Sequence, residues 1–434
     1  MVKVAIVDQS VSAGGVERFI RELVAAMLRS SDADKFEITV LLRQYNSAGL
    51  PVDWPSELQR PNLHVRYLLD GSGGGEYFKW LQKPGRLLGL PFSDYARWLV
   101  FQVVAGNWIE KVCRREKYDI VYFPYPYDIK CPKLQAPIVA TFHDFNFKHT
   151  ELGSYHFLHR LLLNSWTPPW FARCYRIMVD CDFTREEIRK FFAGHVDKVQ
   201  VVRLGVPTSG RIPEPSHLTQ FQERNNLPRD FLFSPAWICT HKNQALLVEA
   251  LGKLKKKGTM IPVVFTGPNS EELSPDNVSP HNAYVRKLRD LIQKNDLVYR
   301  HDYFCLGFVN EFEMDCLYRL ASALVSPSLY EGFGLPVLEA TKAGCPVICS
   351  DIPPYVEHNE LLGDSFLLFD PRDSDSLAAK VEQFLSNRQL VKSRTAIGAG
   401  LLDQNFSWQV VAGKYMECFE KAVDGNQGHV QSIS

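Results

Sequence analysis

The chain has 434 residues, of which 45% are hydrophobic and 23% are charged, and this composition is typical of a folded globular protein. At about 150 residues per domain, the length predicts two or three domains, with two favoured. Basic and acidic residues both number 49, so the formal net charge is zero and there is no overall basic field to hold nucleic acid. These values exclude a disordered or fibrous chain and predict no nucleic-acid partner.

The ten cysteines are scattered and contain no C-x-x-C pair. Such thiols favour a reducing compartment over a disulfide scaffold. Residues 1–8 have the pattern of a strand and not that of a signal peptide. No window reaches the roughly 18 uncharged apolar residues that a membrane span requires. We therefore expect a cytoplasmic protein.

Short apolar runs alternate with amphipathic stretches along the first half of the chain. This alternation predicts a doubly wound parallel sheet. The predicted helices include residues 15–29 and 94–116. The predicted strands are residues 2–7, 36–42, 63–69, 119–123, 138–142, 175–179 and 198–204.

A polar, proline-bearing connection over residues 208–228 separates the two halves, and we place the domain boundary within it. The alternation then restarts, with a predicted helix over residues 243–256 and a last helix over 408–423. The strands predicted here are residues 231–235, 262–266, 303–307, 321–326, 347–350 and 366–369. The sequence thus predicts an α/β protein with two Rossmann-like domains facing a cleft, over residues 1–207 and 208–406.

The segment 327–340 carries the clearest chemical signal. A buried strand pattern ends at Ser326, a glycine-rich loop follows, and Pro336 favours the first turn of a helix. Gly332 and Gly334 remove side-chain bulk where backbone N–H groups and the helix dipole point outward. This arrangement at the carboxyl end of a parallel strand suits a diphosphate. The alternative is a loop that binds no phosphate.

Charged side chains accompany this loop. Glu331 precedes the glycines and Glu339 follows them, and carboxylates in these places are better suited to sugar hydroxyls than to phosphate. Lys242 follows a strand and begins a predicted helix, so it is the candidate cation for phosphate charge. The alternative for Lys242 is a solvated surface lysine. His143 ends an apolar strand beside Asp144, where it is either a structural histidine or a ligand-binding one.

The loop and the segment after it, residues 340–351, resemble the retaining glycosyltransferases of family 4, which have the GT-B fold. Shorter matches follow in the family's order over most of the chain. They are residues 12–18 for the N-terminal glycine loop, 141–144 for the histidine-bearing strand end, 198–206 for the close of the first domain, 241–243 for the phosphate lysine, and 304–309 and 406–408.

The resemblance implies a nucleotide-sugar donor bound in the second domain, and a C-terminal helix, residues 407–434, that crosses back to the first. It assigns catalytic roles to Glu331, His143 and Lys242, with Glu331 and His143 near the donor sugar. It also implies that Glu339 binds the ribose. The other donor-binding positions that it implies are Gly14, Gly15, Gly307, Phe308, Val309, Gly332, Phe333, Gly334 and Leu335.

Nothing in the sequence requires a metal ion or another cofactor. Asp180-Cys181-Asp182 has the D-x-D spelling of metal-dependent sugar transferases, but it lies before a helix start. Asp182 or Thr184 is therefore more simply a helix N-cap. The twelve histidines are scattered without the spacing of zinc sites.

The chain departs from the family just before Lys242, where many members have an arginine and this chain has P-A-W-I-C-T over residues 235–240. Lys242 acts either with the loop amides and Gly15 alone or with Arg18 or Arg203. The acceptor is a glycan or is lipid-linked. Residues 94–116 form either a core helix or one that contacts a membrane surface peripherally.

We therefore predict a metal-independent, retaining hexosyltransferase that uses a nucleotide diphosphate sugar. The segment 241–243 favours GDP-mannose or a related hexose donor. A nucleotide-sugar epimerase or hydrolase, and an inactive donor-binding subunit, are the alternatives. An NAD-dependent oxidoreductase is disfavoured, because Gly14-Gly15 does not form the G-x-G-x-x-G pattern.

Overall fold

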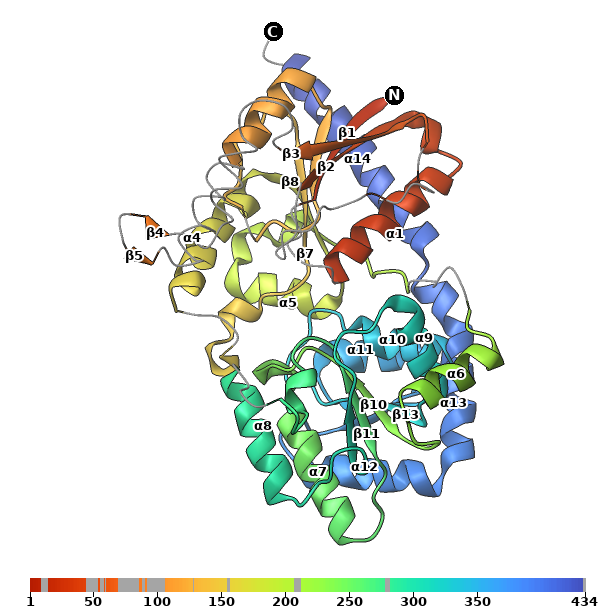
Figure 1. Cartoon of the computed structure of the whole chain (residues 1–434). Helices are drawn as coiled ribbons and strands as arrows, with labels where there is room; N and C mark the ends of the chain where they lie inside the picture. The colour runs from red at the N-terminus through yellow and green to blue at the C-terminus, as the bar shows by residue number, and fades with distance from the viewer. Residues whose placement is uncertain are drawn as a thin grey trace. The chain divides into compact units, whose positions relative to one another are not determined.

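The computed structural model describes residues 1–8, 15–43, 54, 58, 60–68, 86–87, 90–91, 106–127, 129–153, 157–206, 212–277 and 282–431. The chain divides into two compact units, each a parallel sheet covered by helices (Figure 1). The first unit comprises Met1–Phe145, Phe157–Gly205 and Trp408–Ser434, and the second Asn146–His156 and Val206–Ser407.

In the described part of the first unit, seven parallel strands form one sheet in the order β3-β2-β1-β6-β7-β8-β9. The order reverses between β1 and β6, as in doubly wound folds. Central strands such as β7 are buried on both faces, which is why they form continuous apolar runs in the sequence. The strands are β1 (Val2–Asp8), β2 (Phe36–Arg43), β3 (Leu63–Leu68), β6 (Ile120–Phe123), β7 (Ile138–Phe142), β8 (Cys174–Val179) and β9 (Val199–Val201).

The last helix, α14 (Trp408–Gln431), belongs to the first unit and packs against α1 (Gly15–Arg29). Its Tyr415 hydroxyl lies 2.8 Å from the Oγ1 atom of Thr141 inside the core. At its start, Trp408 packs directly on Gly205, where a Cβ atom would overlap the indole ring. The other described helices of this unit are residues 106–116, α4 (Phe157–Arg173) and α5 (Asp182–Phe191); residues 94–105 of the predicted helix lie outside the described residues.

In the second unit, the described residues form a six-stranded parallel sheet in the order β12-β11-β10-β13-β14-β15, which reverses between β10 and β13. The strands are β10 (Leu232–Pro235), β11 (Val263–Thr266), β12 (Tyr303–Cys305), β13 (Ala323–Ser326), β14 (Val347–Ser350) and β15 (Leu367–Phe369). Eight helices of eight or more residues cover this sheet among the described residues. They are α6 (Pro215–Arg224), α7 (Gln244–Lys256), α8 (Ala283–Lys294), α9 (Glu311–Leu320), α10 (Leu335–Lys342), α11 (Pro353–Leu361), α12 (Ser374–Ser386) and α13 (Arg388–Asn405).

The predicted α/β class with two Rossmann-like sheets is confirmed, and one detail is corrected. The connection predicted over residues 208–228 contains helix α6. Glu214 and His217 form a capping box at its start, and Pro215 occupies its first position, where proline is well tolerated. The prolines and polar residues that indicated a connection are therefore the start signals of a helix.

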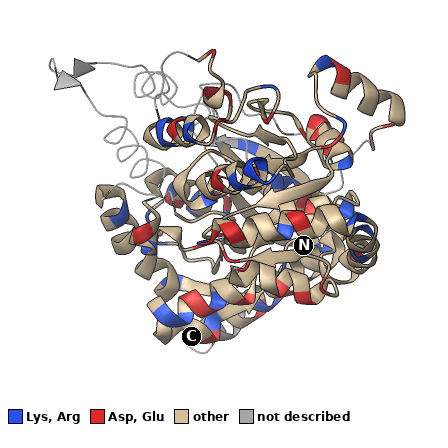
Figure 2. Ribbon diagram, turned by 90° about the horizontal axis from the view of Figure 1, so that it is seen from below, with Lys and Arg blue, Asp and Glu red and all other residues tan. Residues whose placement is uncertain are grey.

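The surface carries charges of both signs. Figure 2 shows Lys and Arg interspersed with Asp and Glu along the helices, in keeping with the zero net charge. The ten cysteines are all free, and most are buried. No helix among the described residues is long and apolar enough to cross a membrane.

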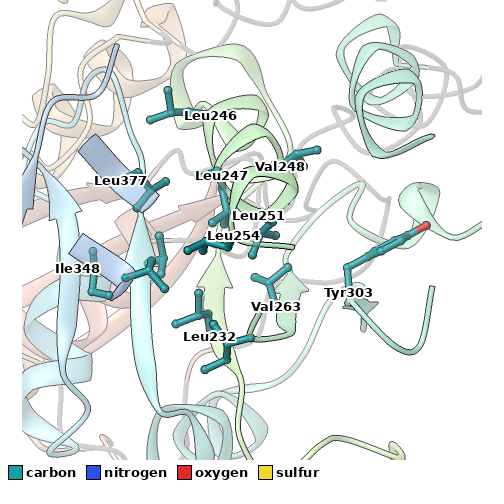
Figure 3. Packing of buried hydrophobic residues seen from close by; sticks show 14 of the residues in the cluster. Leu232, Leu246, Leu247, Val248, Leu251, Leu254, Val263, Tyr303, Ile348 and Leu377 are labelled. Atoms are coloured by element: carbon teal, nitrogen blue, oxygen red, sulfur yellow. The ribbon is translucent and has the colours of Figure 1, made fainter. Parts of the chain in front are cut away.

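Helix α7 supplies much of the core of the second unit (Figure 3). Its side chains at positions 247, 251 and 254 are fully buried against the sheet. Leu232 of β10 and Val263 of β11 meet them from below, and Leu377 of α12 belongs to the same cluster. The burial holds the start of α7, and with it Lys242, at the end of β10.

We expect Leu254→Ala to lower the free energy of unfolding by about 2–5 kcal/mol, because Leu254 is fully buried and its loss leaves a cavity. Leu390→Ala in α13 is the matched control, since Leu390 is 55% exposed. Urea denaturation followed by circular dichroism measures both. Equal effects of the two substitutions would contradict this account of the core.

Candidate active site

Lys242 and Glu331 lie on either side of the point where the strand order of the second unit reverses. β10 leads through the 3-10 turn Thr240–Lys242 into α7, and β13 leads through the glycine loop into α10. β10 and β13 are neighbours, so their carboxyl ends meet at the place where doubly wound sheets bind ligands. Lys242 does not begin the helix as predicted: it ends the 3-10 turn, and Asn243, in the left-handed region at φ 56°, precedes the first residue of α7.

The two side chains form a partly buried ion pair. The Lys242 ammonium lies 2.7 Å from Glu331 Oε1 and 2.8 Å from Oε2. Ser328 donates to Oε1 at 2.7 Å and the Tyr355 hydroxyl donates to the same atom at 3.2 Å. Burial alone raises the pKa of Glu331, but Lys242 and Ser328 outweigh it and the pKa is lowered. Glu331 is therefore an anion that accepts hydrogen bonds.

The printed contacts do not use the full hydrogen-bonding capacity of this pair. An ammonium group has three N–H donors, so Lys242 can bind both oxygens of Glu331 and one further acceptor at once. Oε1 of Glu331 accepts from three groups, whereas Oε2 accepts only from Lys242 among the described residues. The pair can thus present one N–H donor and one carboxylate oxygen to a ligand.

The glycine loop is held from behind by helix α11. Gly334, at φ 88°, caps the start of α10, and a Cβ atom there would overlap the Tyr355 ring. His358, one turn further along α11, donates from Nε2 to the Phe333 carbonyl at 2.8 Å. Pro336 has no backbone N–H and the Val337 N–H donates to the Gly334 carbonyl at 3.4 Å. The start of α10 can therefore offer the Leu335 N–H to an anion.

The other predicted positions of the second unit lie on α10, in the loop after β12 and in the glycine loop itself. Glu339 on α10 accepts a hydrogen bond of 2.9 Å from the hydroxyl of Tyr318. Gly307, at φ 68°, donates to Ser270 Oγ at 3.1 Å, and Phe308 beside it is 71% exposed. Val309 completes the loop between β12 and α9 and is half-buried. Gly332 and Leu335 lie in the loop and at the first position of α10.

A hollow of about 410 Å³ lies at the neighbouring strand ends, beyond β14 and β15. Leu329 of the glycine loop forms one wall, and the side-chain amide of Asn243 donates to the Pro371 carbonyl at 2.9 Å. The other lining residues are Asp351, Ile352, Pro353, Asp370, Pro371 and Arg372. Its acidic and basic side chains suit hydroxyl groups.

His143 and Gly15 belong to the first unit, and Gly14 lies outside the described residues. His143 Nδ1 is 2.6 Å from Asp180 Oδ2, and Nε2 is 2.9 Å from the Pro124 carbonyl. Because both partners are acceptors, both ring nitrogens carry protons and the imidazole is charged. Burial lowers the pKa of His143, but Asp180 and the Pro124 carbonyl outweigh it, so the pKa is raised. A direct bond from His143 to a ligand would replace one of these contacts.

The D-x-D segment is engaged within the protein. Asp180 holds His143, while Asp182 pairs with Arg203 and with Arg185, each at 2.7 Å. The predicted N-cap is wrong, because Cys181 occupies that position without a side-chain cap and Asp182 is the first helical residue. Among the described residues, no group of three His, Cys, Asp or Glu side chains could hold a metal ion.

Sequence patterns did not reveal the residues that complete the site. Ser328 lies within the loop, three residues before Glu331, so its hydroxyl could have been predicted from the sequence as a hydrogen-bond donor to that carboxylate. Tyr355 is 24 residues from Glu331 in the chain, and Tyr318 is 21 residues from Glu339. Asp180 is 37 residues from His143. Only the pairing of parallel strands brings these partners together.

Two family comparisons agree with this fold. Residues 13–209 match the family described as Glycosyltransferase Family 4, and residues 217–399 match Glycosyl transferases group 1. The two matches cover most of the chain. The chain therefore belongs to the group 1 glycosyltransferases of family 4, and its fold is GT-B.

Individual relatives are more distant. An O-antigen chain mannosyltransferase B of Escherichia coli is 40% identical over 104 residues, which is 24% of this chain and 26% of that protein. This chain spans only about a quarter of the length of that relative and of a serotype-specific mannosyltransferase of the same species. A phosphatidyl-myo-inositol mannosyltransferase of Mycobacterium leprae is 23% identical over 85% of this chain and 91% of its own.

Solved structures share the fold at low identity. A sucrose-phosphate synthase from Thermosynechococcus elongatus superposes with a TM-score of 0.69 and 16% identity, covering 98% of this chain and 100% of that one. WaaG, a glycosyltransferase of lipopolysaccharide biosynthesis, superposes with a TM-score of 0.66 and 16% identity over 98% and 100% of the two chains.

The charged His143 predicts a pH dependence. Its raised pKa contributes stability that is complete below about pH 6.5 and is lost as the pH rises through the folded-state value. In Asp180→Asn we expect the pKa of His143 to fall, since burial remains and its carboxylate partner is gone. Histidine NMR titration measures the pKa, and Asp182→Asn is the matched control. An unchanged pKa in Asp180→Asn would refute the assignment.

Proposed function

We propose that this chain is a retaining glycosyltransferase that moves a hexosyl group from a nucleotide diphosphate sugar to a glycan or lipid-linked acceptor without a metal cofactor. The Lys242–Glu331 ion pair at the reversal point of the sheet, beside the start of α10, carries the proposal. It offers a cation and the Leu335 N–H to a diphosphate, and a carboxylate to a sugar.

The chemistry of transfer explains why these groups lie together. As the glycosidic bond of the donor breaks, negative charge gathers on the departing phosphate. The remaining N–H donor of Lys242 and the Leu335 amide at the start of α10 stabilise that charge without reorganising. Oε2 of Glu331 accepts a hydrogen bond from the sugar or stabilises its developing positive charge. In the retaining reaction, the departing phosphate accepts the proton of the acceptor hydroxyl.

The relatives support a sugar donor and a glycan or lipid acceptor. Their names include an O-antigen chain mannosyltransferase and a phosphatidyl-myo-inositol mannosyltransferase. Among the structural neighbours, Anabaena HepE was solved with UDP and glucose, and a structure described as trehalose-6-phosphate from E. coli was solved with UDP-2-fluoro glucose. We place the protein in the cytoplasm, with peripheral contact to a membrane when the acceptor is lipid-linked; the free cysteines support a reducing compartment.

Exposed rings beside Gly307 support a base site, and a carboxylate there favours guanine. Trp237 after β10 is 55% exposed and Phe308 after β12 is 71% exposed. These strands flank β11, so the two exposed rings follow strand ends that are about 10 Å apart. Glu271 lies against Gly307, where a Cβ atom would be 3.5 Å from its Oε2 atom. A carboxylate accepts from the two adjacent N–H donors of guanine, whereas uracil offers only one.

A panel of GDP-, UDP- and dTDP-sugars tests the donor class by thermal shift in the presence of EDTA. A donor at 100 times its Kd should stabilise the protein by about 2.7 kcal/mol. We expect a GDP-hexose to stabilise most, and Glu271→Gln to weaken GDP binding more than UDP binding. Binding that disappears in EDTA and returns with Mg²⁺ would contradict metal independence.

Product analysis separates the proposal from its alternatives. A transferase consumes the donor only when an acceptor is present and preserves the anomeric configuration, which NMR of the product reports. Donor turnover without acceptor would indicate the epimerase or hydrolase instead. Tight binding of a donor with no turnover under any acceptor would indicate an inactive binding subunit.

We expect Lys242→Ala to lower the rate at saturating donor by about 10² to 10³, because a preorganised cation is lost where charge develops. Donor affinity should change less, since other groups also bind the diphosphate. Lys253→Ala on α7 is the matched control, because Lys253 pairs with Asp375 at the surface. Steady-state kinetics measures both variants. If Lys242→Ala keeps more than about a tenth of the wild-type rate, Lys242 does not have this role, and Arg18 and Arg203 become the candidate cations.

A further inference from the structure

Helix α11 packs against the sheet and also contacts the glycine loop. One of its side chains, Tyr355, reaches the loop at two residues, Glu331 and Gly334. Tyr355 is fully buried. Its ring fills the space over Gly334, and its hydroxyl reaches Glu331 Oε1 at 3.2 Å. It therefore contacts the residue that precedes the glycines and the residue that caps α10.

The direction of the hydrogen bonds around Tyr355 is fixed by chemistry. Glu331 is an anion and can only accept, so the Tyr355 hydroxyl donates to it. The same hydroxyl lies 2.7 Å from Ser326 Oγ, and it must therefore accept the proton of Ser326. A relay of Ser326 to Tyr355 to Glu331 thus runs from the end of β13 into the ion pair.

We propose that Tyr355 is a positioning residue of the donor site. With Ser328 it occupies Oε1 of Glu331, which turns Oε2 and the remaining N–H donor of Lys242 toward the donor. The same side chain fixes the conformation of Gly334 and so the direction of the Leu335 amide at the start of α10. This role rests on the proposed function and names no further ligand: it assigns the orientation of Glu331 to a residue of α11.

The alternative is that Tyr355 only fills space. The ring and the hydroxyl separate these two roles, because Tyr355→Phe keeps the ring over Gly334 and removes the proton given to Glu331. We expect Tyr355→Phe to lower the melting temperature modestly, because Ser326 loses its buried acceptor, and to leave the Kd for a nucleoside diphosphate nearly unchanged. The rate at saturating donor and acceptor should fall about tenfold or more, as for the loss of a hydrogen bond to a charged group.

Two tyrosines of the same unit serve as controls. Tyr318→Phe removes the hydroxyl that binds Glu339 at 2.9 Å, so it should weaken donor binding more than it slows transfer. Tyr303→Phe removes a buried hydroxyl that donates to the Leu273 carbonyl at 3.4 Å, and it should change neither quantity. The three variants share one chemical change, the loss of a buried tyrosine hydroxyl, at positions where the hydroxyl has different partners.

The pH dependence of the rate gives a second readout that a space-filling role would not move. Loss of a donor to Glu331 disfavours its charged form, so the acid limb of the profile should shift to higher pH in Tyr355→Phe. Ser328→Ala removes another donor to the same oxygen and should shift the limb in the same direction. It also provides the test if Tyr355→Phe does not fold.

The outcomes distinguish this inference from the proposed function. If the wild-type protein neither binds nor consumes any nucleotide sugar, the proposed function fails. If the wild type is active and both Tyr355→Phe and Ser328→Ala keep its rate within about twofold and its acid limb, the positioning role fails alone. A loss of rate with unchanged nucleotide affinity and a shifted limb supports it.

Discussion

The candidate site of the second unit depends on the ion pair between Lys242 and Glu331. Charges removed from water are costly unless they are paired and hydrogen-bonded, and here Ser328 and Tyr355 both donate to one oxygen of the partly buried carboxylate. The pair joins the segments after β10 and β13, the two strands between which the sheet reverses direction. The fold thus brings a cation and an anion to its natural ligand-binding edge.

A site built in this way has its charges arranged before a ligand arrives. Lys242 is held by Glu331, so the ammonium cannot swing freely, and Glu331 is held by α11 through Tyr355. Such preorganisation is what makes electrostatic stabilisation effective, because no group has to move as charge develops. The hydrophobic packing of α7 on the sheet serves the same end, since it fixes the position of the 3-10 turn that carries Lys242.

The first unit also has a charged side chain held by partners at the carboxyl end of its sheet, but the group is a histidine. His143 lies at the end of β7 and is held as a cation between Asp180 and the Pro124 carbonyl. Charged groups at the carboxyl ends of parallel strands therefore occur in both units, each stabilised by a partner from a neighbouring strand end. The D-x-D spelling that resembles a metal site serves as part of this support, and its two carboxylates face His143 and Arg203.

The sequence by itself determined the α/β class, the strands and the chemical types at the site, because apolar periodicity and the glycine loop are local properties. The bounds of α1 and β7 are as predicted, and Glu331, Lys242 and Gly334 were named from local context. Only the tertiary structure decided which groups meet. Lys242 and Glu331 are 89 residues apart and Tyr355 lies 24 residues beyond Glu331, so their contacts follow from the order of the strands and not from any local pattern.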